Sequence, residues 1–201
     1  MPVKGSHSPP NLTACVAEQL GKFAAAHGAD YAKDPFATGG DADAQPEPDA
    51  LPIYRVDVDQ MRVSPKTAIE RARQIGWRYR ADIKGQAPSL VNVFPRGATS
   101  PSLEVVQGAA VGRLNAAGRI AAQDAREGED YEPRVLDFGP LGMTELWLHN
   151  PSVDVPDRFY SLGSARPVAR GAEKVLAEAG KRAASLPADD GSVDESGPFA
   201  R

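Results

Sequence analysis

The sequence predicts an α+β domain between Leu51 and about residue 186 of a 201-residue chain. Three observations support this class. Short segments alternate polar and apolar residues with the period of a strand, and other segments repeat apolar residues with the period of a helix. The two kinds of segment follow one another in the order β-α-β-β-α-β-β. The chain is long enough for one packed domain with extensions.

The first predicted strand covers 53–59, where polar and apolar residues alternate through the whole segment. A helix is predicted over 64–75, with Ser64 as the N-cap and Pro65 in the first helical position. Gly76 follows the last turn as a stop signal. The apolar stripe of this helix consists of Ala68, Ile69, Ala72 and Ile75.

Strands 77–83 and 89–94 are predicted to form a hairpin across a Gly- and Pro-containing turn. Trp77 and Tyr79 alternate with arginines on the first of these strands, so both rings are expected on the buried face. A long helix is predicted to follow over 102–125.

Three glycines interrupt the predicted helix 102–125, at Gly108, Gly112 and Gly118. Each glycine inside a helix costs about 1 kcal/mol relative to alanine. We interpret these small residues as allowing close approach to a sheet or another helix. Strands 134–138 and 144–150, an edge strand at 158–162 and a helix over 167–186 complete the expected domain.

The predicted fold is a sheet of five or six strands with helices 64–75 and 102–125 on one face. The order of elements is that of the ferredoxin-like (split βαβ) sandwich, with extra N- and C-terminal helices. RNA-recognition modules share this order, but residues 89–95 lack the Gly- and aromatic-rich signature of their third strand. Many unrelated functions use such a fold, which therefore does not indicate a function.

The extensions are predicted to differ in character from domain 51–186. Residues 1–50 combine a helix over 11–27 with a Pro-, Gly- and Asp-rich segment that we expect to be a flexible linker. The acidic tail 187–201 is expected to be disordered. One face of the first helix is apolar and is predicted to bind a partner groove or the chain's own sheet. This face consists of Leu12, Val16, Leu20 and Phe23.

Composition excludes several classes of protein. Cys15 is the only cysteine, so neither an internal disulfide nor a cysteine-based zinc cluster can form. The N-terminal segment lacks the apolar core of a signal peptide, and no stretch reaches the roughly 20 apolar residues of a membrane helix. We therefore expect a cytoplasmic protein without a membrane partner. Nucleotide-binding glycine loops and hydrolase elbows are also absent from the sequence.

The net charge of −4 is unevenly distributed along the chain. Residues 1–50 carry −4, residues 51–101 carry +5 and residues 102–201 carry −5. A basic middle between acidic flanks indicates either an anionic partner or flanks that fold back over the middle. We favour the second interpretation.

Asp57 and Asp59 are the first candidate catalytic or metal-binding residues. Two positions apart on a strand, their carboxylates would project from one face and could share a divalent cation. Arg55 lies on the same face and could neutralise them, and a solvated strand face is the alternative interpretation. No cofactor is otherwise predicted.

Glu145 and His149 form a second candidate site on a later strand. They share one face with Trp147 and could ligate a metal or transfer protons. If this strand lay beside the first, the carboxylates of Asp57 and Asp59 could join them. A polar outer face with an exposed aromatic ring is the alternative.

A basic segment within residues 62–96 is a candidate anion-binding or nucleic-acid surface. It combines cations for phosphates with rings for stacking, although alternation places the rings opposite the strand arginines. The cations are Arg71, Arg73, Arg78, Arg80 and Lys84.

The sequence favours a non-catalytic protein- or ligand-binding accessory module of a soluble assembly, with a protein partner. A metal-assisted enzyme that uses Asp57 and Asp59 is one alternative, and a nucleic-acid-binding module is another. The sequence does not determine the ligand, the partner or the oligomeric state.

Overall fold

A computed structural model of the chain describes residues 50–81, 89–96, 99–125, 129–152 and 154–187. The predicted N-terminal helix, most of the predicted linker and the predicted tail lie outside these residues, and so does Lys84.

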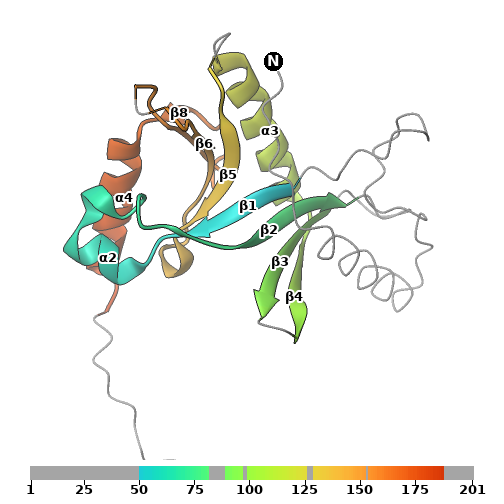
Figure 1. Cartoon of the computed structure of the whole chain (residues 1–201), viewed down its shortest axis with the longest axis horizontal. Coiled ribbons are helices and arrows are strands. Elements are labelled where there is room, and N and C mark those ends of the chain that lie inside the picture. Colours follow the sequence, from blue (N-terminus) through green and yellow to red (C-terminus); the bar gives the residue numbers. More distant parts are fainter. Residues whose placement is uncertain (1–49, 82–88, 97–98, 126–128, 153, 188–201) are drawn as a thin grey trace, which may run out of the picture.

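The described residues form one eight-stranded mixed sheet with the order β4-β3-β2-β1-β5-β6-β7-β8 (Figure 1). Only the β1–β5 pair is parallel, and every other pair of neighbours is antiparallel. The strands are β1 Ala50–Arg55, β2 Arg73–Ala81, β3 Ser89–Arg96, β4 Thr99–Val106, β5 Glu132–Asp137, β6 Thr144–His149, β7 Arg158–Ser161 and β8 Ala169–Arg170. The α+β class is therefore confirmed. The sheet is larger than expected, and the ferredoxin-like order is not confirmed.

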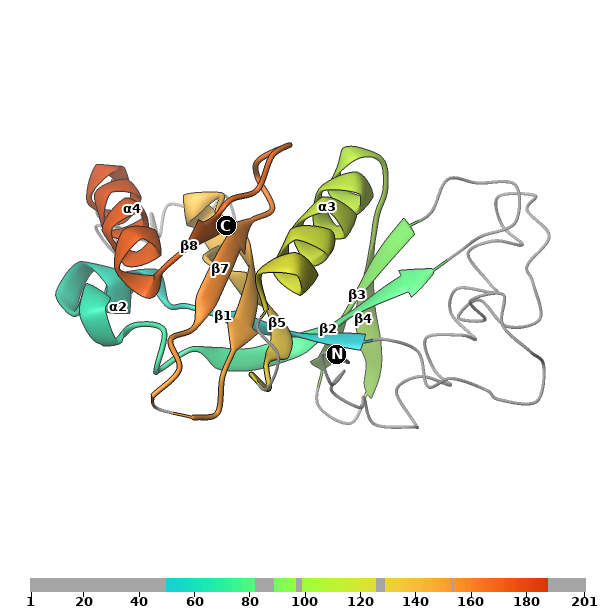
Figure 2. The same ribbon diagram turned by 90° about the horizontal axis from the view of Figure 1, so that it is seen from above.

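Helices cover both faces of the sheet rather than one. The helices are α2 Val58–Val63, α3 Ala109–Asp124 and α4 Ala172–Ser185. Along β6, Trp147 packs in a cluster with residues of α2 and α4, whereas Leu146 and Leu148 pack with α3. Because successive side chains of a strand point to opposite faces, α3 lies on the face opposite α2 and α4, as Figure 2 shows. The prediction of both helices on one face is therefore wrong.

The predicted helix 64–75 is wrong. Residues Pro65–Thr67 form only a 3-10 turn, and β2 begins at Arg73. Ala68 is buried in the core cluster below α2, so the apolar residues of the segment are packed without a helix. The alternating aromatic and β-branched residues from Ile75 onward favour a strand, and pairing with β1 extends that strand back through Gly76.

The predicted helix 102–125 is wrong in its first part. Residues up to Val106 form β4, in which Leu103 pairs with Val93 of β3. Gly108 then adopts a positive φ of 73° and is the N-cap of α3. A left-handed backbone is accessible to glycine at little cost, so this glycine makes the sharp change from strand to helix.

The remaining predicted strands are confirmed with small changes of boundary. The segment around Trp77 is extended and pairs with β3, as expected. The strand predicted at 158–162 is β7, although it is not an edge because β8 pairs with it. The last helix begins at Ala172 rather than at 167. None of the described helices combines the length and apolar character needed to cross a membrane.

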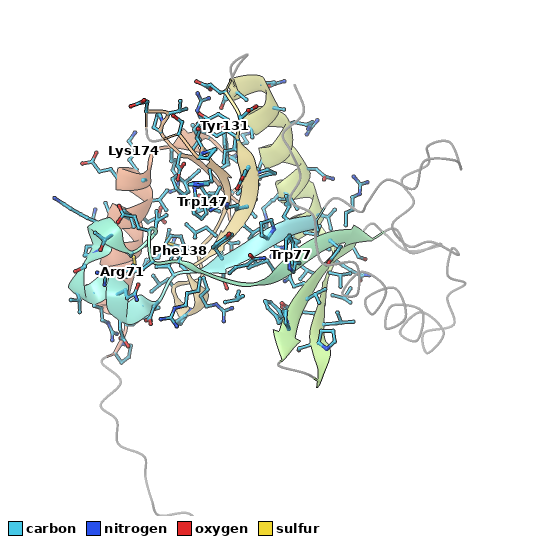
Figure 3. All side chains as sticks on the ribbon, in the orientation of Figure 1. Arg71, Trp77, Tyr131, Phe138, Trp147 and Lys174 are labelled. Atoms are coloured by element: carbon cyan, nitrogen blue, oxygen red, sulfur yellow. The ribbon has the colours of Figure 1, made fainter. Side chains whose placement is uncertain are left out.

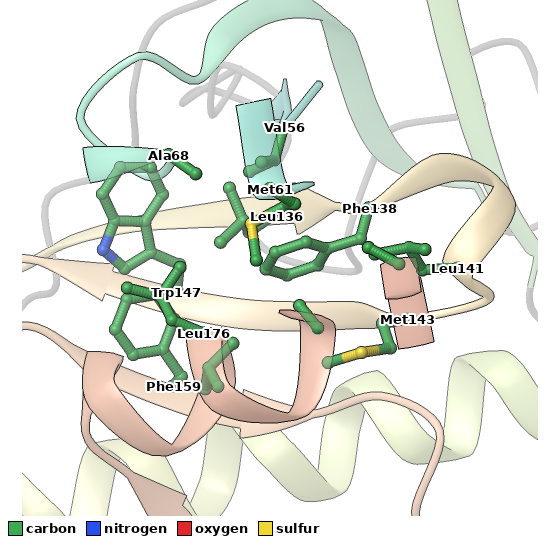
Figure 4. Close-up of a cluster of buried hydrophobic side chains, with 13 residues drawn as sticks. Val56, Met61, Ala68, Leu136, Phe138, Leu141, Met143, Trp147, Phe159 and Leu176 are labelled. Carbon is green, nitrogen blue, oxygen red and sulfur yellow. The ribbon is translucent and has the colours of Figure 1, made fainter. Parts of the chain in front are cut away.

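The largest core cluster joins α2 and α4 to the β5–β7 end of the sheet (Figure 4). Phe138 and Phe159 are fully buried at its centre, and Trp147 stacks on Phe159 with ring centroids 6.0 Å apart. Burial of an aromatic side chain of this kind contributes roughly 1.5–3 kcal/mol relative to exposure. This cluster fixes the short helix α2 against α4.

Candidate functional site

Asp57 and Asp59 do not lie on a strand, so the prediction of two carboxylates on one strand face is wrong. Asp57 is the N-cap of α2, and its Oδ1 accepts a hydrogen bond from the Asp59 backbone N–H at 2.9 Å. The Asp59 side chain is 83% exposed and lies 3.5 Å from an Arg62 nitrogen. Both carboxylates thus interact with the helix start, where acidic groups are favourable.

Within the described part of the chain, no third metal ligand joins these two aspartates. Among the described residues, no group of three or more His, Cys, Asp or Glu side chains is arranged to hold a metal ion. Ca²⁺ takes six to eight oxygen ligands, more than two carboxylates provide.

Glu145 is buried, with 1% exposure, and belongs to a chain of charges between the sheet and α4. An Arg170 nitrogen of β8 lies 2.5 Å from Glu145 Oε1, and a second lies 2.6 Å from Glu178 Oε2. Glu178 also accepts a hydrogen bond from Arg182 at 2.6 Å. Burial raises the pKa of the Glu145 carboxyl, and Arg170 opposes this rise. Since solvent hardly reaches Glu145, its contacts are those of a structural ion pair.

His149 is anchored by a different carboxylate from the one expected. Its Nδ1 lies 3.3 Å from Oδ2 of Asp157, and the same oxygen accepts a hydrogen bond from Trp147 Nε1 at 2.7 Å. Asp157 Oδ1 accepts from the Asn150 backbone N–H at 2.9 Å. Trp147 is buried and contacts the His149 ring edge-on, so the prediction of an exposed aromatic ring is wrong.

Glu145 and His149 lie on the same face of β6, as the alternation predicts. Each has its own partner, Arg170 and Asp157 respectively.

The described arginines of the basic segment differ in their surroundings. Arg71, Arg73 and Arg80 are exposed, whereas Arg78 donates to Asn92 at 2.7 Å. Burial lowers the pKa of the Arg78 guanidinium, and the nearby carboxylates of Asp137 and Glu104 raise it in part. In Figure 3, Arg71 lies beside α2, and Trp77 lies among the strands of the opposite end.

The rings of Trp77 and Tyr79 belong to the core of the sheet. Tyr79 is completely buried and Trp77 is partly buried, both within a cluster of strand side chains. This agrees with the alternation of the sequence, which places the rings opposite Arg78 and Arg80.

A cavity that could hold a ligand is a groove between α3 and the sheet. Its volume is about 610 Å³, within the roughly 300–1,000 Å³ of typical ligand sites. Leu146 and Leu148 of β6 line it together with Leu114 and Gly118 of α3. Gly118 contributes no side chain, and a Cβ built there has no atom within 4 Å. We call this cavity the α3 groove.

Two cations belong to the lining of the α3 groove. They are Arg80 of β2 and Arg119 of α3. Leu51 of β1 continues the apolar lining beside Arg80. The groove therefore combines an apolar floor with positive charge, as sites for amphipathic anions do.

The sequence interpretation missed the α3 groove, although one signal was present. We interpreted the small residues of the long helix as permitting close packing. In the structure, Ala117 and Ala121 are buried, and Gly118, Ala121 and Ala122 line the groove. The small side chains thus serve both purposes on one helix.

A second cavity, of about 460 Å³, lies beside Asp157 and Arg170. Its charged groups have partners within the protein. Arg158 binds Glu129 at 3.0 Å, and Tyr160 donates to Asp124 at 3.1 Å. Burial, and then the Asp124 carboxylate, raise the pKa of Tyr160 to about 12.

No family model, curated protein or solved structure matches this chain. The geometry of the site is thus the basis for a functional assignment.

Proposed function

We propose that this chain is a non-catalytic binding module of a cytoplasmic assembly and that its ligand occupies the α3 groove. The ligand is an amphipathic anion, with an apolar chain or ring beside a carboxylate or a similar group. The observation that carries this proposal is the groove itself, with its leucine floor and its two arginines, Arg80 and Arg119.

Size and charge both support this ligand class. A volume of about 610 Å³ suits a small molecule or one face of a short peptide. Leu146 and Leu148 are 3% and 1% exposed, so the floor is rigid core rather than a mobile surface. A ligand anion in the groove lies within a lining that includes Arg119.

The titratable groups support binding rather than catalysis. Glu145 is committed to Arg170 in the core, Asp57 caps a helix, and His149 is held by Asp157. None of these groups lines the α3 groove. A general acid or base must lie within hydrogen-bond reach of the reacting group, and these groups are placed elsewhere.

The experiment fills the α3 groove by enlarging the side chain of Gly118, a residue of its lining. Gly118→Trp places an indole in the groove, because a Cβ at this position meets no neighbouring atom. Gly112→Trp is the matched control: Gly112 lies in the same helix, is exposed, has no atom near its Cβ and does not line the groove. Both variants are checked for wild-type circular dichroism and urea midpoints.

The probes are dodecanoate and the fluorescent naphthalene sulfonate that it displaces, titrated at constant ionic strength. We expect Gly118→Trp to weaken binding of both probes at least about tenfold, or ~1.4 kcal/mol, and Gly112→Trp to leave it unchanged. Arg119→Glu should weaken dodecanoate more than dodecanol. No binding to the wild type, or equal binding by both tryptophan variants, would contradict the proposal.

A further inference from the structure

The α3 groove runs across the strands of the sheet rather than along them. Helix α3 follows β4 in the chain, and Gln107 in the connection donates to Ser89 Oγ of β3 at 3.0 Å. At the other end of the helix, Asp124 accepts a hydrogen bond from Tyr160 of β7 at 3.1 Å. Strands β2, β1, β5 and β6 lie between β3 and β7. The helix therefore crosses these strands, and so does the groove beside it.

The helix and the sheet give the same length for the groove. On the helix, the lining extends from Leu114 to Ala122, which is about 12 Å at 1.5 Å per residue. On the sheet, it extends from Arg80 of β2 to Leu148 of β6, and β1 and β5 lie between these two strands. The distance from β2 to β6 is about 14 Å at the usual spacing of neighbouring strands. The groove is therefore about 12–14 Å long.

The two ends of the groove differ in chemistry. The β2 end contains the exposed Arg80 and the first turn of the α3 lining, which includes Asn115. Arg119 follows one turn later, and helical side chains lean toward the helix N-terminus, so Arg119 is directed to the turn of Asn115. The lining at the β6 end includes apolar residues of both walls, namely Leu146, Leu148, Ala121 and Ala122.

The floor of the groove favours an alkyl chain over a peptide. Leu146 and Leu148 offer no hydrogen bonds from their side chains. A bound peptide would place backbone N–H and C=O groups against these leucines, and burial of such groups without partners is costly. An alkyl chain has no polar groups to satisfy.

We infer, on the basis of the proposed function, that the ligand is a single-chain alkyl carboxylate that lies across the strands. Its head lies at the β2 end, near Asn115 and Arg119, and its tail extends toward β6. An extended chain advances about 1.2 Å per bond, so a groove of 12–14 Å holds about 10–12 carbons. The groove thus selects chain length, because methylenes beyond Ala122 stay in water.

The first test is a chain-length series with the wild-type protein. Alkanoates from octanoate to hexadecanoate, each below the concentration at which it forms micelles, displace the naphthalene sulfonate at constant ionic strength. We expect the dissociation constant to fall roughly fourfold with each added methylene up to about 10–12 carbons, and to change little beyond that length. An undiminished gain from dodecanoate to hexadecanoate would overturn the inference.

The second test concerns the direction of the ligand. Ala122 is an exposed lining residue at the β6 end, so Ala122→Phe occupies the place of the tail. This variant should bind dodecanoate at least about tenfold more weakly and octanoate as the wild type does. Gln123→Phe is the matched control, since Gln123 is exposed beside Ala122 and lies outside the described lining, and it should leave both affinities unchanged. Equal weakening of octanoate and dodecanoate by Ala122→Phe would place the head at the β6 end and overturn the inference.

The two tests separate this inference from the proposed function. If no alkanoate displaced the probe from the wild type, the proposed function would fail together with the inference. If alkanoates bound without a limit of length, or with the head toward β6, only the inference would fail. Circular dichroism and urea midpoints verify that both phenylalanine variants are folded.

Discussion

Gly76→Ala is expected to destabilise the protein strongly, although it adds one methyl group. Gly76 is a buried residue of β2, opposite Ile53 of β1, where the register between the two strands shifts. A Cβ at this position would lie 2.2 Å from the carbonyl oxygen of Val93 and 3.0 Å from Cδ1 of Phe94. Ordinary contacts of a Cβ begin near 3.4 Å. Strands β2 and β3 would have to separate by about 1 Å to admit the methyl group.

The magnitude follows from what this separation breaks. The obstructing atom is backbone, so no side-chain rotation relieves the contact. Overpacking of a close-packed interior costs roughly 1–3 kcal/mol, and each lost ladder hydrogen bond costs about 1 kcal/mol more. We expect the free energy of unfolding to fall by about 2–4 kcal/mol, a large part of a typical total of roughly 5–15 kcal/mol.

The assay is urea denaturation followed by far-ultraviolet circular dichroism, with linear extrapolation to water. Gly112→Ala is the matched control. Gly112 is exposed on α3, its Cβ meets no atom within 4 Å, and its backbone is helical. This variant should gain roughly 0.5–1 kcal/mol from helix propensity. If the free energy of unfolding of Gly76→Ala lay within about 0.5 kcal/mol of the wild-type value, the reasoning would be refuted. A difference of that size is small beside the expected loss.

Two further predictions concern carboxylates that the sequence suggested as catalytic. Asp57→Ala removes the cap of α2 and should lower the free energy of unfolding by about 1 kcal/mol. Asp57→Asn keeps an oxygen that accepts the hydrogen bond, so its free energy of unfolding should fall less. Equal falls for the two variants in urea denaturation would argue against a capping role. Calorimetric titration of the wild type with Mg²⁺ and Mn²⁺ tests the metal hypothesis for the same residue. For Glu145, the raised pKa means that the folded state holds its proton to higher pH than the unfolded state. Proton binding by Glu145 therefore stabilises the folded state at pH values below about 4.3, the ordinary pKa of a glutamate. This stabilisation is lost as the pH rises through the pKa that Glu145 has in the folded state. Glu145→Gln has no such loss, so its stability relative to the wild type should increase with pH across this window; a constant difference in urea series at several pH values would contradict the assigned shift.

The local patterns of the sequence predicted most strands because the period of two is a property of neighbouring residues. The alternation through Trp77 and Tyr79 is the clearest case, and the structure pairs this segment with β3. Gly76 shows where such reasoning fails. A glycine after an apolar helical stripe indicates a helix stop, but here it is a strand residue without room for a side chain. Only the position of β3 next to Gly76 shows that this glycine is a strand residue and not a helix stop.

The candidate sites were predicted less well because their partners are distant in the sequence. The shared face of Glu145 and His149 follows from alternation alone. Their partners, Arg170 and Asp157, are supplied by β8 and by the loop before β7. Asp57 was placed on a strand because the alternation continues past Arg55, where the chain in fact turns into α2. The lining of the α3 groove comes from α3 and from strands β1, β2, β5 and β6, so no local sequence pattern indicates it.

The two edges of the sheet bear on how copies of this protein behave at high concentration. An unpaired strand edge is a template for a strand from another molecule, and long flat edges promote aggregation. Strand β8 has only two residues, which is too short to guide such pairing. Strand β4 is longer, but Pro101 lacks an N–H to donate and Glu104 adds an exposed charge. Both edge strands therefore disfavour pairing with a strand of another molecule, the route by which an open sheet aggregates.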